Sequence, residues 1–125
     1  MLQGARNFKM TDLQLLNEWE FKAEIVRWRI KYDRIYFRNE QDSFEDWVQS
    51  YRIPPIDYVH VDSFIDSDGD VITYLKGSMK IDRTQSRNTH SQIVTFYHVV
   101  RTFIDCPEVE PYPMGYYIIS FEQGL

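Results

Sequence analysis

The sequence predicts an α+β domain in which a curved antiparallel sheet packs on one or two short N-terminal helices. Two observations support this fold class. In the segment 56–81, two long β-type stretches flank a tight Asp-Ser-Asp-Gly-Asp turn, which is the pattern of a β-hairpin. The helix signals lie before this hairpin, and further strand-like segments follow it toward the C-terminus.

The length of 125 residues predicts a single domain over 1–125, with residues 1–10 as a loose lead-in. Aromatic residues make up 16% of the chain, which suggests broad apolar faces or a large contact surface. The 14 basic and 19 acidic residues give a net charge of −5, which argues against a free-standing nucleic-acid-binding domain with its basic footprint.

Cys106 is the only cysteine, so an intrachain disulfide is excluded and a reducing compartment fits best. No apolar run has the length of a membrane span, and the N-terminus lacks the apolar core of a signal peptide. We therefore expect a soluble cytoplasmic or nuclear protein that needs no cofactor and does not insert into a membrane.

Two interpretations fit the chain between residues 12 and 38. In the first, Thr11 or Asp12 caps a short helix, and Ala23–Lys31 forms a strand that turns into a shorter strand at Ile35–Arg38. The β-branched and aromatic composition of this stretch favours a pleated surface. The alternative is one helix from Asp12 to Arg38. Apolar residues with helical spacing support it, at Leu16, Trp19, Ala23, Val26 and Ile30.

A second helix is predicted after a capping box formed by Asp42 and Glu45. Its apolar side chains share one face, at Phe44, Trp47, Val48 and Tyr51. The Pro54-Pro55 pair ends it, because proline cannot continue a helix.

Four strands follow. They are predicted at Ile56–Asp66, Val71–Asp82, His90–Phe103 and Tyr116–Glu122. Alternation places three apolar side chains of the first strand on one face, at Val59, Val61 and Ile65. It does the same for Val71, Leu75, Met79 and Ile81 in the second strand. The third strand is apolar on both faces, which predicts burial on both sides.

Several motifs in this order resemble the nuclear transport factor 2-like (NTF2-like) family, a cystatin-like α+β roll. They are Trp28, the helix at Phe44–Trp47, the hairpin with Gly77, the segment Ile93–Phe96 and the last strand at Tyr116–Ile119. The greatest similarity is to the small subunit, or the NTF2-like domain, of the mRNA export receptor heterodimer. The resemblance implies a non-catalytic domain that pairs sheet to sheet in a homo- or heterodimer, and a role as an mRNA nuclear export adaptor.

The aromatic excess points to the same kind of surface, because tyrosine and tryptophan dominate binding hot spots. The residues predicted to form the interface are Tyr74, Thr95, Tyr97, Val99, Phe103, Tyr112, Met114 and Tyr117.

An enzymatic alternative stays open, because some NTF2-like proteins are isomerases, dehydratases or cyclases with an acid–base residue inside an apolar cone. The candidate residues are Asp33, Glu24 and His98, with Tyr97 and Tyr117 as further candidates. A third alternative is a viral or bacterial inhibitor or immunity protein of the same build, which the small size and negative charge permit.

Basic residues alternate with aromatic ones in the segment 27–38, a pattern that binds single-stranded RNA by stacking and phosphate contact. The predicted RNA contacts are Arg27, Arg29, Lys31 and Arg34. Solvated charge on the outer face of a hairpin is the favoured interpretation.

No metal site is predicted. The aspartates Asp66, Asp68 and Asp70 are spaced as in a calcium loop, but the sixth position holds valine and the twelfth holds glycine. A hairpin turn explains them better. His60 and His98 are expected on neighbouring strands, without the cysteine or carboxylate partners that a zinc site requires.

Overall fold

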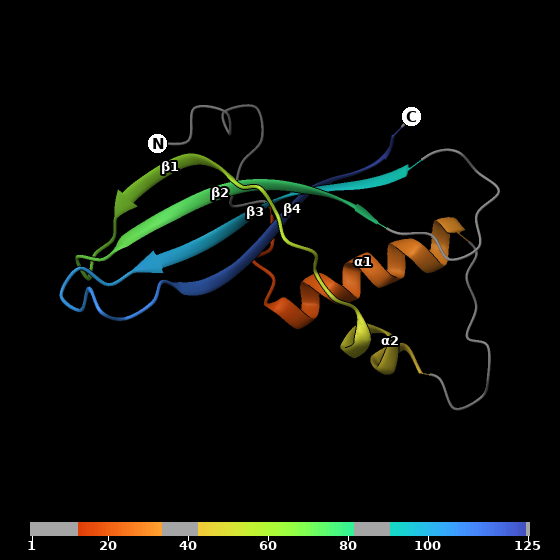
Figure 1. Cartoon of the computed structure of the whole chain (residues 1–125), viewed down its shortest axis with the longest axis horizontal. Helices are drawn as coiled ribbons and strands as arrows, with labels where there is room; N and C mark the ends of the chain where they lie inside the picture. The colour runs from red at the N-terminus through yellow and green to blue at the C-terminus, as the bar shows by residue number, and fades with distance from the viewer. Residues whose placement is uncertain (1–12, 34–42, 82–90, 125) are drawn as a thin grey trace.

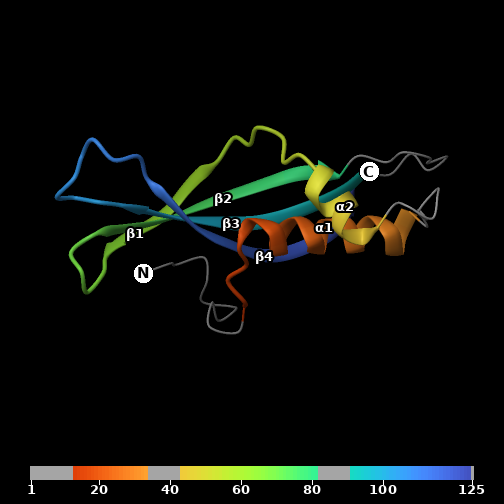
Figure 2. The same cartoon turned by 90° about the horizontal axis from the view of Figure 1, so that it is seen from below.

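The computed structural model describes residues 13–33, 43–81 and 91–124. The elements in chain order are α1 (Glu18–Asp33), α2 (Phe44–Ser50), β1 (Val59–Ile65), β2 (Val71–Ile81), β3 (Ser91–Thr102) and β4 (Tyr112–Gly124). The strands form one antiparallel sheet in the order β1-β2-β3-β4 (Figure 1). Both helices lie on one side of this sheet (Figure 2). The predicted class, an α+β fold with a curved antiparallel sheet and two short helices, is confirmed.

The helix α1 replaces the strand predicted at Ala23–Lys31, and that prediction is wrong. The alternative of a helix is confirmed for residues 18–33, while the second predicted strand, Ile35–Arg38, lies outside the described residues. Phe21 and Ile25, four residues apart, are buried against the sheet. Residues on another side of α1 are buried against α2. A helix buried on two sides is rich in apolar residues, so tertiary packing overrides the β-type composition here.

The start of α1 is fixed by a reciprocal capping box between Asn17 and Glu20. The Oδ1 atom of Asn17 accepts from the backbone N–H of Glu20 at 2.8 Å, and Oε1 of Glu20 accepts from the N–H of Asn17 at 2.9 Å. The helix therefore begins later than the predicted caps at Thr11 or Asp12 required. Leu16 lies just before the cap and forms a β-bridge to Tyr116, with two N–H···O bonds of 2.8 Å.

The second predicted helix is confirmed as α2. Its capping box lies one residue later than predicted, between Ser43 and Asp46. Its one fully buried side chain, Val48, contacts the side of α1 that carries Ala23 and Val26. The two helices thus share a small cluster of their own beside the main core.

The main core lies between α1 and the sheet, with Phe21 at its centre. The Phe21 ring centroid is 4.2 Å from that of Tyr116 in a stacked arrangement and 4.8 Å from that of Phe96. Trp28 is a residue of α1, and not of the first hairpin in which the family resemblance placed it. Its ring stacks on Phe121 of β4, with 4.4 Å between the centroids. These ring contacts join the first described helix to the last strand.

The predicted face of β2 is confirmed, because Met79 and Ile81 are buried in the core on the helix side. The face predicted for β1 is wrong. An irregularity between His60 and Asp62 shifts the register, so that Val59 pairs with Lys76 whereas Ile65 pairs with Val71. Lys76 and Val71 are an odd number of residues apart along β2, so their side chains point to opposite faces of the sheet. Val59 and Ile65 therefore lie on opposite faces too.

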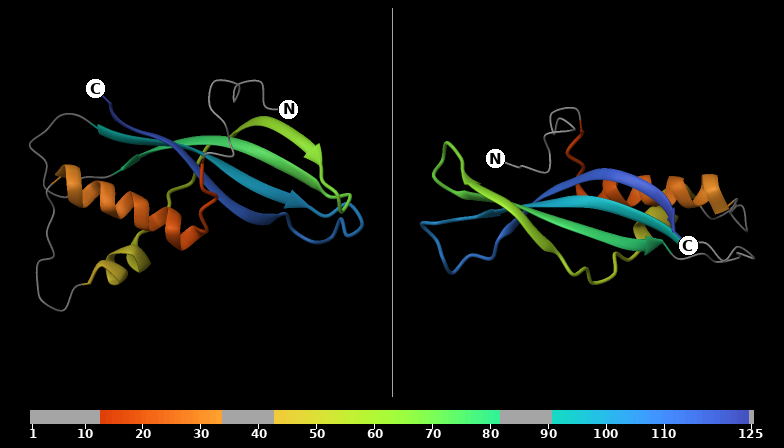
Figure 3. Two further views of the ribbon diagram at one scale, coloured as in Figure 1. Left: turned by 180° about the vertical axis from the view of Figure 1, so that it is seen from behind. Right: turned by 90° about the horizontal axis from the view of Figure 1, so that it is seen from above.

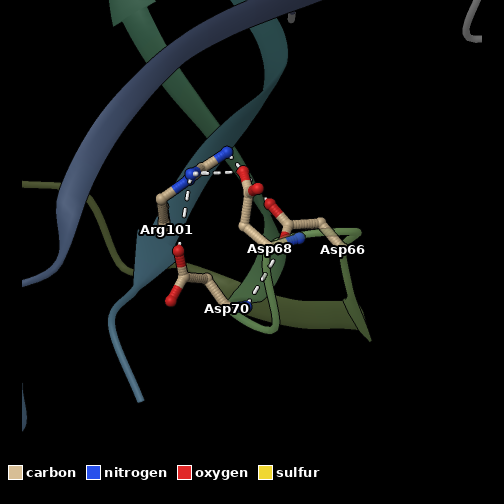
Figure 4. A network of polar contacts seen from close by, with 4 residues as sticks. All are labelled: Asp66, Asp68, Asp70 and Arg101. Carbon is tan, nitrogen blue, oxygen red and sulfur yellow. Dashed lines mark hydrogen bonds and ion pairs between the residues drawn. The ribbon is translucent and has the colours of Figure 1, made fainter. Parts of the chain in front are cut away.

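The half of the sheet with the β1–β2 turn and the β3–β4 loop extends beyond both helices (Figures 1 and 3). The predicted hairpin turn is confirmed there. Asp66 Oδ1 accepts from the backbone N–H groups of Asp68 and Asp70 at 3.0 Å each, and Gly69 has φ +85°. Arg101 of β3 forms ion pairs with all three aspartates (Figure 4), at 3.0 Å to Asp66, 3.7 Å to Asp68 and 3.4 Å to Asp70. These ion pairs thus connect the β1–β2 turn to strand β3.

Candidate interaction face

The side of the sheet away from the helices carries a group of aromatic and β-branched side chains that we call the tyrosine face. It consists of Phe64, Tyr74, Thr95, Tyr97, Val99 and Tyr117. The register places them together, because Tyr74 pairs with Val99 and Tyr97 pairs with Tyr117. No helix of the described residues lies over this side of the sheet (Figure 1).

Ring contacts make this face continuous across the four strands. The Tyr74 centroid is 6.1 Å from Phe64 of β1, 6.2 Å from Tyr97 of β3 and 6.3 Å from Tyr117 of β4. The Tyr74 and Tyr117 rings are nearly parallel, with 8° between their planes. Aromatic pairs at such separations are favourable beyond their buried area. The side chains are therefore held in place before any partner binds.

The accessible part of the face differs from its buried part. Tyr97 and Val99 are each 3% exposed, so they form the buried part of this face. Phe64 is 46% exposed, and Tyr74 and Tyr117 are half-buried. Burial raises the pKa of Tyr74 above its usual value of 10.0, and the neighbouring Tyr117 adds to the rise. The phenol of Tyr74 is thus neutral at physiological pH, and its contact with a partner requires no desolvation of a charge.

Five of the eight residues predicted for an interface lie on this face. The other three, Phe103, Tyr112 and Met114, lie around the β3–β4 loop at the far end of the sheet. Tyr112 is 59% exposed there. The sequence-based prediction missed Phe64, because it placed no interface residue on the first strand of the sheet. The buried pair Val94 and Val99, on opposite faces of β3, confirms the predicted burial of that strand on both sides.

The structure separates the enzymatic candidates. Glu24 lies on the exposed surface of α1 and forms a 2.7 Å ion pair with Arg27. Asp33 is the last residue of α1, and its side chain lies outside the described part of the chain. His98 is on the helix side of β3, whereas Tyr97 and Tyr117 are on the opposite face. The sheet therefore divides the predicted acid–base residues.

His98 packs between two tyrosines in the core layer. Its ring stacks on Tyr116 at 4.5 Å and lies 5.5 Å from Tyr58. Both ring nitrogens are buried and have no hydrogen-bond partner among the described residues. His60 does not lie on a neighbouring strand, because β2 intervenes and Leu75 pairs with both histidines. A substrate cannot reach the buried nitrogens in this conformation.

This environment predicts a pH-dependent stability. Burial lowers the pKa of His98 below its usual 6.5, and the carboxylate of Glu18 only partly opposes the shift. The unfolded chain therefore takes up a proton before the folded chain does, and stability falls as pH drops below about 6.5 until the folded-state pKa is passed. Each unit of difference between the two pKa values corresponds to about 1.4 kcal/mol.

Denaturant unfolding of the wild type and of His98→Phe at pH 7.5, 6 and 5 measures this effect. We expect the substituted protein to lose less stability on acidification, because phenylalanine keeps the stack on Tyr116 and cannot be protonated. Equal losses in the two proteins would contradict the assignment. NMR titration of the His98 ring gives the folded-state pKa directly.

The predicted RNA contacts do not form one basic strip. In a helix, Arg27 and Lys31 share a face while Arg29 points elsewhere. The Arg27 guanidinium lies 5.0 Å from the centroid of the Phe44 ring, in addition to its pair with Glu24. Trp28 faces the sheet, and Arg34 lies outside the described residues. The interleaving that suggested RNA stacking depended on a strand, and the helix removes it.

Within the described ranges, no group of three or more histidine, cysteine, aspartate or glutamate side chains is placed to hold a metal ion. The helices of that part of the chain are also too short or too polar to cross a bilayer. The chain matches no family model, no curated protein and no solved structure. The resemblance to the NTF2-like family therefore stays a prediction.

Proposed function

We propose that this chain is a non-catalytic protein–protein interaction domain that forms a homodimer through the tyrosine face. The observation that supports this function is a pre-ordered aromatic surface on the side of the sheet that bears no described helix. Tyrosine gives large contact area at small cost in side-chain entropy, and aromatic side chains dominate the centres of interfaces.

The charges at the border of this face favour a second copy as the partner. Lys80 of β2 and Glu122 of β4 both pair with Ile93 of β3, so they lie on the same side of the sheet at opposite edges. Both side chains are exposed. When two such faces meet about a two-fold axis parallel to the strands, the basic edge of one copy lies over the acidic edge of the other. The surface is thus complementary to itself.

The architecture adds support by analogy. A curved antiparallel sheet packed on short helices is compatible with an NTF2-like roll, and the resembling export-type domains pair sheet to sheet. Such analogy bears on the mode of association and not on the identity of a cellular partner.

Light scattering coupled to size exclusion tests the proposal. The wild type is expected to have about twice the chain mass of 15.1 kDa at high concentration and to dissociate on dilution. Tyr117→Lys places a charge in the centre of the interface and is expected to give a monomer. Trp19→Lys, at an exposed position on the helix side, is the matched control and should leave the dimer intact.

Circular dichroism of both variants shows whether the fold survives. A wild type that stays monomeric up to about millimolar concentration would overturn the proposal. A folded Tyr117→Lys variant that remains dimeric would do so too.

A further inference from the structure

The edge of β2 carries a second surface, which adjoins the border of the tyrosine face at Lys80. Strand β1 pairs with β2 only as far as Val59 opposite Lys76. In the described part of the chain, no strand pairs with the following segment, Gly77–Ile81, on that side. The last five residues of β2 therefore form an edge of the sheet, whereas the preceding residues of this strand pair with β1.

The segment before β1 does not continue the pairing with β2, for two physical reasons. Pro54 and Pro55 have no N–H group and cannot complete a ladder. Gly77 has no side chain, and the side chains of Ile56 and Tyr58 occupy that space. A Cβ atom on Gly77 would lie 2.7 Å from Ile56 and 2.9 Å from Tyr58. The segment before β1 is thus drawn over the helix side of the sheet instead of along the edge.

The hairpin turn shows which backbone groups face the free edge. The N–H of Asp66 donates to the carbonyl of Asp70 at 2.9 Å, so these residues form a hydrogen-bonded pair. Hydrogen-bonded positions alternate along an antiparallel strand, and the even-numbered residues of β2 therefore face β1. Beyond the end of β1, the N–H and C=O groups of Ser78 and Lys80 point to the free edge.

A groove of about 510 Å³ lies along this edge. Its lining consists of Pro54, Pro55, Ile56, Asp57, Ser78, Met79 and Lys80. The volume is in the range of ligand-binding clefts. Pro54 and Pro55 line the groove beside the edge of β2, just before β1 begins, so a segment that enters the groove lies against these prolines.

We propose that this groove binds an extended peptide segment of a partner protein by adding a strand to the free edge of β2. The backbone groups of Ser78 and Lys80, which pair with no strand among the described residues on this side, recognise the peptide main chain. On the outer face, Lys76 and Lys80 flank the added strand, and neither forms an ion pair with a described residue. An acidic residue is therefore favoured at alternate peptide positions, and an apolar one between them faces Met79 and Ile56.

Amide hydrogen exchange in the full chain tests the free edge first. The amides of Ser78 and Lys80 should exchange rapidly, whereas those of Gly77 and Met79, which pair with β3, should be protected. Protection of Ser78 and Lys80 in the isolated protein would overturn the proposal, because the edge would already be covered.

The binding test uses a fluorescent seven-residue peptide that alternates valine and glutamate. We expect saturable binding, protection of the Ser78 and Lys80 amides, and at least about fivefold weaker binding of a peptide that alternates valine and lysine. Ser78→Pro removes one edge donor and should weaken binding at least about tenfold, whereas Ser78→Ala keeps the donor and should bind like the wild type. Lys80→Glu should abolish the preference between the two peptides, because the new carboxylate offsets the charge of Lys76.

The Lys80→Glu result keeps the test decisive even if Ser78→Pro does not fold. Absence of saturable binding, or equal binding by Ser78→Pro and Ser78→Ala, would overturn the peptide site. Because Lys80 also lies at the border of the tyrosine face, light scattering of each variant measures the oligomeric state alongside the peptide affinity, so loss of peptide binding and loss of the dimer are distinguished.

Discussion

Replacing Phe21 by alanine is expected to lower the free energy of unfolding by about 3–5 kcal/mol. Phe21 is fully buried and contacts the rings of Phe96 and Tyr116, so the truncation removes the centre of the interface between α1 and the sheet. The cavity is bounded by elements from both ends of the chain, and it cannot close by a local shift alone. Chemical denaturation measured at pH 7.5 gives the loss directly.

Trp19→Ala is the matched control, because Trp19 is on the same helix and is 45% exposed. Its truncation should cost less than about 1 kcal/mol, since little packing is lost. A loss for Phe21→Ala no greater than that for Trp19→Ala would contradict the central role of this ring.

Replacing Gly115 by alanine has the second-largest expected effect, a loss of about 2–4 kcal/mol. Gly115 has φ +147°, which side chains with a Cβ atom rarely adopt. An added Cβ would also lie 2.5 Å from the backbone oxygen of Leu16, whose bridge to Tyr116 would have to move. The partner atom is a backbone atom, so no side-chain rotation relieves the clash.

Gly69→Ala separates the two causes. Gly69 also has positive φ, +85°, but no atom lies within 4 Å of its missing Cβ. It should lose only the conformational part, about 1–2 kcal/mol. Equal losses for the two alanine variants, measured by thermal and chemical unfolding, would show that the contact with Leu16 contributes nothing.

The hairpins of this fold are predictable because their determinants are local. The aspartate turn needs only Gly69 and the Asp66 carboxylate, which stand three residues apart in the sequence. For α1, the strand interpretation fails because the apolar residues of the helix face two partners, the sheet and α2, and this double burial gives the segment a strand-like composition. The irregularity in β1 likewise depends on how β1 meets β2, and it places Val59 on the face opposite Ile65, which alternation alone does not predict.

The candidate surfaces show the same limit. Thr95, Tyr97 and Val99 alternate along one strand, so their shared face follows from the sequence. The contact of Tyr74 with Tyr117 joins strands β2 and β4 across β3, and it requires the register of both pairings. The free edge of β2 is even harder to predict from the sequence. It arises because β1 begins only at Val59 and because the residues before it pack over Gly77.

The bridge between Leu16 and Tyr116 has a consequence for the order of events during synthesis. The three hairpin pairings join strands that emerge one after another, so each strand can pair soon after its neighbour. The first helix can contact α2 early, through Ala23 and Val26, but its packing on the sheet is completed late. The Phe21 ring can meet Phe96 of β3 first and gains its stack on Tyr116 only when β4 follows. During translation, the stack of Phe21 on Tyr116 is therefore among the last core contacts that can form.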